Sequence, residues 1–419
     1  MSRGGRPAER ASVDAGASLL TRRSLLLGAG SLAAGLVACT GSTVGPGPSG
    51  TAEPSPTSSL APAECGDGGR RAPLWQRPIE RGLVYGSSAA TWQLSDPRYR
   101  RLFEREAAIL FTEDDLLWYR LKPTPDSDLD FRYGDRIVGF AERSGMLVLG
   151  AHLVWDSGFG DGWTEDDLYA YEGRQARDLL LGTIDAVVGR YRGRVAAWIV
   201  VNEALDGFGI RPEVPWYATI GPTYVEESFH AAHEADPDAM LLLNDFGYET
   251  GDQFSSPEGK RTETLTFLDE LLDADVPIHA FGVQAHLDAS FFPDGFDAEA
   301  YRRFLAEIAD RGLRILITEM DVLDDGLPKD VRARDRAVAD VYARYLDVAL
   351  DEPAVASLVT FGLSDRYTWL QEDYPREDGV ARRPLPFDEE MRPKAAFASL
   401  ARALDGAAVR DLAWLPPRC

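Results

Sequence analysis

Eight apolar runs recur along the chain from about residue 80 onward, and many of them end on a polar residue. They read GLVYGSSAAT, AAILFTEDD, MLVLGAHLVWD, VAAWIVVNEA, AMLLLNDFGY, AFGVQAHLD, RILITEMDV and SLVTFGLSD. Between them lie segments whose apolar residues repeat with the period of a helix, such as SDPRYRRLFEREA and ARDLLLGTIDAVVGRYRG. Eight strands that alternate with helices predict an α/β fold, a (β/α)8 TIM barrel built as a single domain.

An open, doubly wound sheet is the main alternative fold, because it also alternates strands with helices. Such sheets commonly carry a Gly-rich phosphate loop after the first strand, and none follows GLVYGSSAAT. The barrel is therefore favoured. Barrel strands are buried on both faces, which accounts for their continuous apolar character, and their C-terminal ends open onto the face where TIM-barrel sites form.

Polar residues gather at those strand ends. Glu203 ends the fourth run and Glu319 ends the seventh. The other residues in such positions are Asn202, Asn244, Asp245, Gln284 and His286. Stability alone gives no reason for polar residues to recur at one end of so many strands, so this face is the predicted active-site face.

Two carboxylates across a barrel mouth suit the cleavage of an acetal. One donates a proton to the leaving oxygen, and the other attacks or stabilises the anomeric carbon. Repulsion between the two keeps one of them protonated, which separates the acid from the nucleophile. A single strand-end Glu is more often a helix cap or a surface ion-pair member, but Glu203 and Glu319 together with His286 and Asn202 favour catalysis.

The segments WIVVNEALDG and ILITEMDV resemble the two active-site signatures of glycoside hydrolase family 10, the retaining endo-β-1,4-xylanases. The similarity runs over roughly residues 80–400 and includes HAFGVQAHLD, GLSDRYTW and PLPFDEEMRPKAAF. The resemblance implies that Glu203 is the acid/base and Glu319 the nucleophile. It also implies that Asn202 contacts the sugar 2-hydroxyl and that His286 with Asp321 orients the nucleophile.

Further substrate contacts follow from the same resemblance, with aromatic rings packing on sugar faces. The residues concerned are Glu113, Trp155, Asn244, Gln284, Phe361 and Trp369. No cofactor is expected. No Cys or His spacing predicts a metal site, which disfavours a metal-dependent barrel hydrolase.

The third strand departs from the family pattern. GAHLVWD replaces the usual GHTLVWH, so Ala151 and Asp156 stand where two histidines are usual. His152 is displaced by one position and, on a strand, should face the other way. On the fourth strand, Ile199 replaces the Asp of WDVVNE.

The second and last strands differ as well. FTEDDLLW replaces TPENEMKW, so that Glu113 is retained and Asp114 takes the place of Asn. Leu117 replaces the Lys that grips the second glycone sugar, and Phe361 stands where a Trp is usual. The catalytic pair is intact while the glycone side is rebuilt.

The favoured function is a retaining endo-β-1,4-glycanase that acts on xylan or a related β-linked polysaccharide. One alternative is a family 10-like β-glycosidase with a different or decorated substrate. Another is a non-catalytic carbohydrate-binding lipoprotein, which has no need for both Glu203 and Glu319. The formal net charge of −24 argues against nucleic acid as a partner, so the expected partner is a poly- or oligosaccharide.

The N-terminus is predicted to be a targeting segment. Residues 1–38 contain the twin arginines Arg22 and Arg23 before a short apolar stretch, and LVAC resembles a lipobox that would lipidate Cys39. Residues 39–72 form a Pro/Ser/Gly-rich linker, and residues 73–419 form the barrel domain. The expected product is an exported cell-surface or periplasmic lipoprotein, or one released outside the cell, held to a membrane only by its lipid.

Two further cysteines, Cys65 and Cys419, flank the predicted domain. In an exported protein such a pair is more often bonded than free, so a Cys65–Cys419 disulfide is expected. The protein is expected to be a monomer.

Overall fold

The computed structural model describes residues 71–171, 173–251 and 255–411. They belong to one compact unit that begins at Arg71. The predicted signal peptide, most of the linker and the three cysteines Cys39, Cys65 and Cys419 lie outside the described residues, so the lipid anchor and the disulfide stay predictions. Within the described ranges, no helix is both long and apolar enough to cross a membrane.

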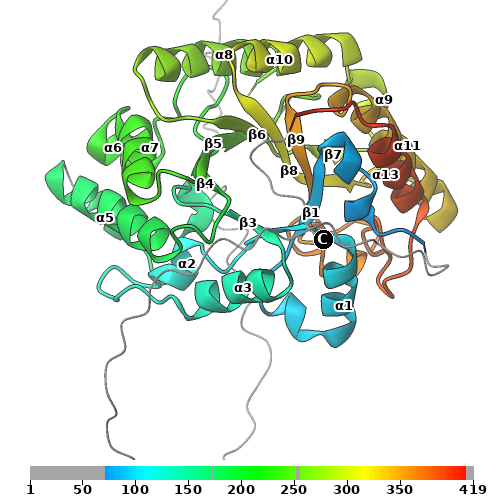
Figure 1. Cartoon of the computed structure of the whole chain (residues 1–419), viewed down its shortest axis with the longest axis horizontal. Coiled ribbons are helices and arrows are strands. Elements are labelled where there is room, and N and C mark those ends of the chain that lie inside the picture. The colour runs from blue at the N-terminus through cyan, green and yellow to red at the C-terminus, as the bar shows by residue number, and fades with distance from the viewer. Residues whose placement is uncertain (1–70, 172, 252–254, 412–419) are drawn as a thin grey trace, which may run out of the picture. The chain divides into compact units, whose positions relative to one another are not determined.

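A closed barrel of parallel strands forms the core of the described part, which confirms the predicted (β/α)8 fold (Figure 1). β1 pairs with both β2 and β9, and β6 pairs with both β5 and β8, which closes the ring. A short extra strand, β7, follows β6 and pairs with β8 alone. The strands are β1 (Val84–Ser88), β2 (Ile109–Phe111), β3 (Leu147–Gly150), β4 (Ala197–Asn202), β5 (Met240–Asp245), β6 (Ala280–Val283), β7 (His286–Asp288), β8 (Arg314–Leu323) and β9 (Val355–Thr360).

Helices surround the barrel, and α11 packs beside α13 (Figure 1). The longer helices are α1 (Pro97–Glu106), α3 (Arg132–Arg143), α5 (Arg174–Arg190), α7 (Tyr224–Ala235), α8 (Pro257–Asp273), α10 (Ala298–Asp310), α11 (Val331–Ala349) and α13 (Ala395–Gly406). The short ones are α2 (Trp118–Leu121), α4 (Glu165–Tyr169), α6 (Pro215–Ile220), α9 (Phe292–Gly295) and α12 (Leu370–Asp373). Single 3-10 turns include η3 (Gln93–Ser95) and η5 (Asp365–Tyr367).

The inside of the barrel is a separate apolar layer made of alternate strand residues. Its buried members are Ile109, Phe111, Leu149, Ala151, Ala197, Ile199, Leu242, Ala280, Leu316 and Val359. The residues between them, such as Leu110 and Trp198, belong to the larger cluster that lies against the helices. Burial on both faces explains why these strands are continuous apolar runs. Gly150 is required beside Trp198, because a Cβ there would lie 2.4 Å from the indole ring.

A buried cluster of charges holds the chain where β8 leaves the barrel. Asp324 is fully buried and pairs with Arg334 of α11 at 2.9 Å and with Arg382 at 3.3 Å. Its backbone carbonyl accepts a hydrogen bond from Arg376. Because β8 carries the predicted nucleophile, this cluster anchors one wall of the site.

Replacing Asp324 by Ala should destabilise the protein by about 3–5 kcal/mol, because two buried guanidinium groups lose their carboxylate. Asp325→Ala is the control, since Asp325 also pairs with Arg382 but is 53% exposed, and should cost about 1 kcal/mol or less. Urea unfolding followed by tryptophan fluorescence measures both. Equal effects of the two substitutions would contradict the assignment.

Candidate active site

Glu203 lies directly after β4, at the mouth of the barrel. Its backbone has a positive φ of 56°, a conformation that costs energy for residues other than glycine and is often found at functional sites. Its N–H donates to the Asn244 carbonyl at 2.9 Å. Trp155 Nε1 donates to one carboxylate oxygen at 2.9 Å and Gln284 Nε2 to the other at 3.0 Å. The carboxyl group is therefore fixed from two sides.

Glu319 lies within β8 and is almost fully buried. Asn244 Nδ2 donates to one of its oxygens at 2.8 Å, and His286 Nε2 lies 3.5 Å from the other. The second ring nitrogen of His286 lies 2.8 Å from Asp321 Oδ1. Trp369 Nε1 donates to Asp321 Oδ2 at 2.7 Å. The predicted trio of Glu319, His286 and Asp321 is thus brought together.

Electrostatics in this trio favours an ionised Glu319. Burial alone would raise the pKa of Glu319, but the hydrogen bond from His286 and the nearby positive charges of His152 and His286 hold it below its usual range. Burial would lower the pKa of His286, yet the carboxylates of Asp321 and Glu319 raise it to about 10. At neutral pH the site therefore holds a carboxylate at Glu319 beside an imidazolium at His286.

A chain of buried amides joins the two glutamates. Asn202 Oδ1 accepts from Asn244 Nδ2 at 2.8 Å and from Gln284 Nε2 at 3.2 Å. These two amides donate in turn to Glu319 and Glu203. The arrangement fixes the relative position of the two carboxyl groups through side chains of four neighbouring strands or strand ends.

Asn244 lies in the interior of the site. The substrate contact that the sequence predicts for it stays a prediction; the structure buries Asn244 fully, and its amide bonds Asn202, Glu319 and Thr318. A Cβ at Gly282 would lie 2.2 Å from Asn244 Oδ1, so glycine is needed to admit it. Asn244 is a positioning residue for Glu319.

The remaining predicted contacts form two groups. Phe361 and Trp369 lie against the His286 ring, with centroids 5.6 and 5.2 Å away. Glu113 follows β2 and accepts from Ser88 Oγ at 2.8 Å and Gln93 Nε2 at 3.0 Å. Burial raises the pKa of Glu113 to about 8.

The prediction for His152 is wrong. It rests on strand alternation, but β3 ends at Gly150, so alternation does not extend to His152. The His152 ring packs against Trp155 at 5.2 Å and Phe111 at 5.7 Å, and its charge acts on Glu319. His152 therefore belongs to the site rather than to the opposite face.

The two apolar replacements lie together. Ala151 and Ile199 belong to the same buried layer inside the barrel, where the family pattern has a His and an Asp. When both partners of a polar contact are replaced by apolar residues, no polar group is left buried without a partner. The paired change therefore leaves no polar group unpaired at these two positions.

Asp156 forms an ion pair that sequence reasoning did not find. Arg211 Nη2 lies 2.7 Å from Asp156 Oδ2, and both side chains are mostly buried. Arg211 Nη1 also donates to the backbone carbonyl of Glu203 at 3.0 Å. Arg211 thus ties the loop after β4 to the segment that follows β3, and no sequence pattern marks it because its partner is 55 residues away.

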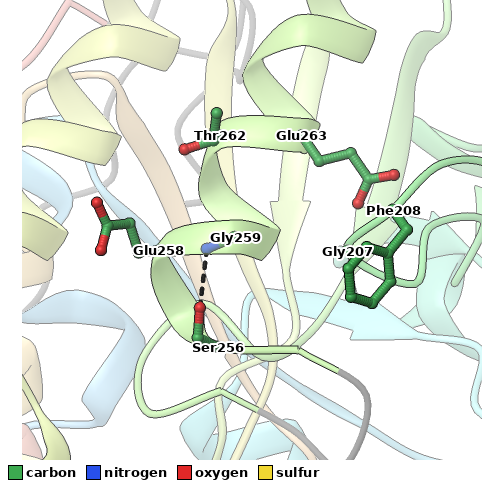
Figure 2. A pocket seen from close by; sticks show the side chains of 7 residues that line it. All are labelled: Gly207, Phe208, Ser256, Glu258, Gly259, Thr262 and Glu263. Atoms are coloured by element: carbon green, nitrogen blue, oxygen red, sulfur yellow. Dashed lines mark hydrogen bonds between the residues drawn. The ribbon is translucent and has the colours of Figure 1, made fainter.

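An exposed aromatic, Phe208, follows Glu203 in the same loop and is 86% exposed. A cavity of about 470 Å³ lies beside it, lined also by Gly207, Ser256, Glu258, Gly259, Thr262 and Glu263 (Figure 2). In Figure 2 the Glu263 side chain extends toward Phe208 across this cavity. Neither Glu203 nor Glu319 lines it, so the pocket is separate from the catalytic pair.

Known proteins resemble this chain over the barrel. The sequence model of glycosyl hydrolase family 10 matches residues 77–403. Endo-1,4-beta-xylanase B of Thermotoga neapolitana is 32% identical over 330 residues, covering 78% of this chain and 89% of that protein. A beta-1,4-xylanase of Dictyoglomus thermophilum is also 32% identical over 330 residues, covering 74% and 85%.

Solved structures of xylanases superpose on this chain. Native xylanase 10B from Thermotoga maritima superposes with a TM-score of 0.70 at 32% identity, covering 80% of this chain and 98% of that one. Xylanase 10B from Thermotoga petrophila RKU-1 in complex with xylobiose superposes with a TM-score of 0.71 at 31% identity, covering 81% and 99%.

Among residues 71–411, apart from the undescribed positions, no group of three or more His, Cys, Asp or Glu is placed to hold a metal.

His286→Asn should move the acidic limb of the pH profile to higher pH. Glu319 must be ionised to attack, its pKa is held low by His286, and loss of that cation raises it, so activity is lost at a higher pH on acidification. The measurement is kcat/KM against pH on an aryl β-glycoside. The exposed His230→Asn is the control, and an unmoved limb in His286→Asn would contradict the account.

Proposed function

This chain belongs to glycosyl hydrolase family 10, and from that premise we propose that it is a retaining endo-β-1,4-xylanase acting on xylan or a related β-1,4-linked glycan. The observation that carries the proposal is the pair Glu203 and Glu319, joined by a buried amide chain at the barrel mouth. The xylobiose bound by the Thermotoga petrophila relative supports an oligosaccharide substrate.

In the first step, the Glu319 carboxylate attacks the anomeric carbon, and the bond to the leaving oxygen breaks. Glu203 donates its proton to that oxygen, so the shortened chain leaves as an alcohol. Glu319 is now esterified to the sugar. The His286 imidazolium, held by Asp321, stabilises the ionised Glu319 before attack. We assign to Asn202 the contact with the 2-hydroxyl of the reacting sugar, as the family resemblance implies.

In the second step, Glu203 is a carboxylate and removes a proton from water. The water oxygen attacks the anomeric carbon, and the ester bond to Glu319 breaks with its electron pair returning to that carboxylate. Two displacements at one carbon restore its configuration. The cycle ends with Glu203 protonated and Glu319 ionised, as it began.

A decorated substrate is a second candidate, favoured by the rebuilt glycone side. Leu117 replaces a charged donor, is almost fully buried, and directly precedes α2. Asp114, Ala151 and Ile199 differ there as well. A purely carbohydrate-binding role is disfavoured, because binding alone does not require the ordered pair Glu203 and Glu319.

We also propose that the protein is exported as a monomeric lipoprotein anchored at Cys39 and carries a Cys65–Cys419 disulfide. The support is the twin arginine, the LVAC segment and the polar linker behind it. Its cell-surface or periplasmic position would place it beside polysaccharide fragments, and release would make it extracellular.

Glu203→Ala should lower kcat/KM by about 10²–10⁴-fold on xylo-oligosaccharides, whose leaving oxygen needs a proton. On a dinitrophenyl β-xylobioside, whose dinitrophenolate leaves without protonation, the first step should still occur, and azide should accelerate turnover. Glu258→Ala, an exposed glutamate on α8, is the control. Equal losses on both substrates without azide rescue would contradict the assignment of Glu203.

Leu117→Lys should raise kcat/KM on an aryl β-xylobioside by about tenfold, because a charged donor contributes roughly 1.5–3 kcal/mol to a hydrogen bond. The flexible stem of lysine can carry the ammonium toward the second sugar. Leu117→Met serves as the matched control and should change nothing. A folded Leu117→Lys variant with no gain would show that the lost lysine does not limit binding.

Cys39→Ser should move the protein from the detergent phase to the aqueous phase of a detergent phase separation, because the variant has no cysteine to carry the lipid. The parent expressed in its exporting host should partition into detergent. The same partition for both proteins would contradict lipidation at Cys39.

A further inference from the structure

Three consecutive acidic residues after β2 each hold one of three consecutive residues after β1. Asp115 accepts from the Thr91 hydroxyl at 2.9 Å and its N–H at 2.7 Å. Asp114 accepts from Trp92 Nε1 at 3.0 Å, and Glu113 accepts from Gln93 Nε2 at 3.0 Å. The loop that carries Trp92 is therefore clamped at three successive positions.

Trp92 is fixed in place and yet open to solvent. Its indole ring meets Tyr367 edge to face, with centroids 5.6 Å apart and planes at 84°. Tyr367 is itself held, because its hydroxyl donates to Asp96 at 2.9 Å. In spite of these contacts, 47% of Trp92 remains exposed. The ring is a rigid apolar surface facing water.

The ring lies at the same rim as the catalytic residues. Trp92 follows β1, and Asp114 follows β2 next to the predicted glycone contact Glu113. Tyr367 lies two residues before Trp369, which donates to Asp321 beside the nucleophile. Trp92 thus contacts residues that neighbour the predicted glycone contacts Glu113 and Trp369 in the sequence.

Single exposed aromatics are common and need no explanation. Phe291, for example, is 69% exposed, and no hydrogen bond could orient its side chain. Trp92 differs because its only polar atom and its flanking residues are all held by acidic side chains. Such preorganisation lowers the entropy cost of binding a flat ligand face.

We propose that Trp92, backed by Tyr367 and oriented by Asp114, is a stacking platform for the third sugar on the glycone side, an uncharged pyranose. This rests on the proposed function. The flat C–H face of a β-linked sugar packs well on an indole. Because Leu117 replaces a lysine, binding of the second sugar is weakened. A stacking platform for the next sugar restores affinity for longer chains.

The sugar is uncharged because the surroundings are acidic. Asp114 lies on the ring itself, and Glu372 lies near enough that its pKa is raised, by burial and by the charges of Asp373 and Asp114. A uronate carboxylate would meet like charge there.

The test compares kcat/KM on an aryl β-xylobioside and an aryl β-xylotrioside. Trp92→Ala should lower the value for the trioside about tenfold, mainly through KM, and leave the bioside unchanged. Asp114→Leu should reproduce part of this loss, whereas Asp114→Asn, which keeps an acceptor for the indole N–H, should not. A trioside with a terminal glucuronic acid should gain nothing over the bioside in the parent enzyme.

Phe291→Ala is the matched control for loss of an exposed aromatic and should affect neither substrate. Equal losses on bioside and trioside in Trp92→Ala would overturn the platform, as would an unchanged trioside. An advantage for the glucuronic acid trioside would overturn the assignment to an uncharged sugar. A parent enzyme that cleaves neither neutral glycoside would refute the proposed function instead.

Discussion

The contact between His286 and Asp321 sets the charge of the site, and the barrel backbone determines that contact. β6 ends at Val283, the chain turns at Ala285 with a φ of 62°, and β7 then pairs in parallel with β8. This pairing places His286 directly opposite Asp321. The imidazolium that results keeps Glu319 ionised despite its burial. Without that cation, burial would raise the pKa of Glu319 and narrow the pH range in which it can attack.

The second constraint is the separation of roles between the two glutamates. Glu319 lies within a strand and is almost fully buried, whereas Glu203 lies just past a strand end and is partly exposed. Exposure gives Glu203 access to the leaving oxygen and to water, while burial removes mobility from Glu319. The hydrogen bonds of Asn202, Asn244 and Gln284 link the two carboxyl groups and fix their relative position. Rigid strands therefore supply the geometry that double displacement needs.

Sequence reasoning found what strand periodicity and local motifs encode. Each of the eight apolar runs overlaps a barrel strand, and Glu203 directly follows β4 as expected. Glu319 was expected at a strand end but lies within β8, which continues to Leu323. Sequence reasoning failed where a strand stops: His152 was assigned by alternation that ends at Gly150. It also missed Arg211 and Trp92, whose partners Asp156 and Asp114 come from other loops. Such contacts depend on how loops of neighbouring strands approach, which no local pattern records. The hydrogen bond from the buried Asn244 to Glu319 is likewise a contact that the sequence did not predict.

The central claim is that Glu319 and Glu203 act in succession on one anomeric carbon. The most direct measurement is proton NMR of the first sugar released from a β-xylo-oligosaccharide, recorded before mutarotation. The account predicts that the new reducing end appears first in the β configuration, because two inversions restore the starting stereochemistry. An α product would mean that water attacks directly, and it would contradict the assignment of Glu319 as the nucleophile.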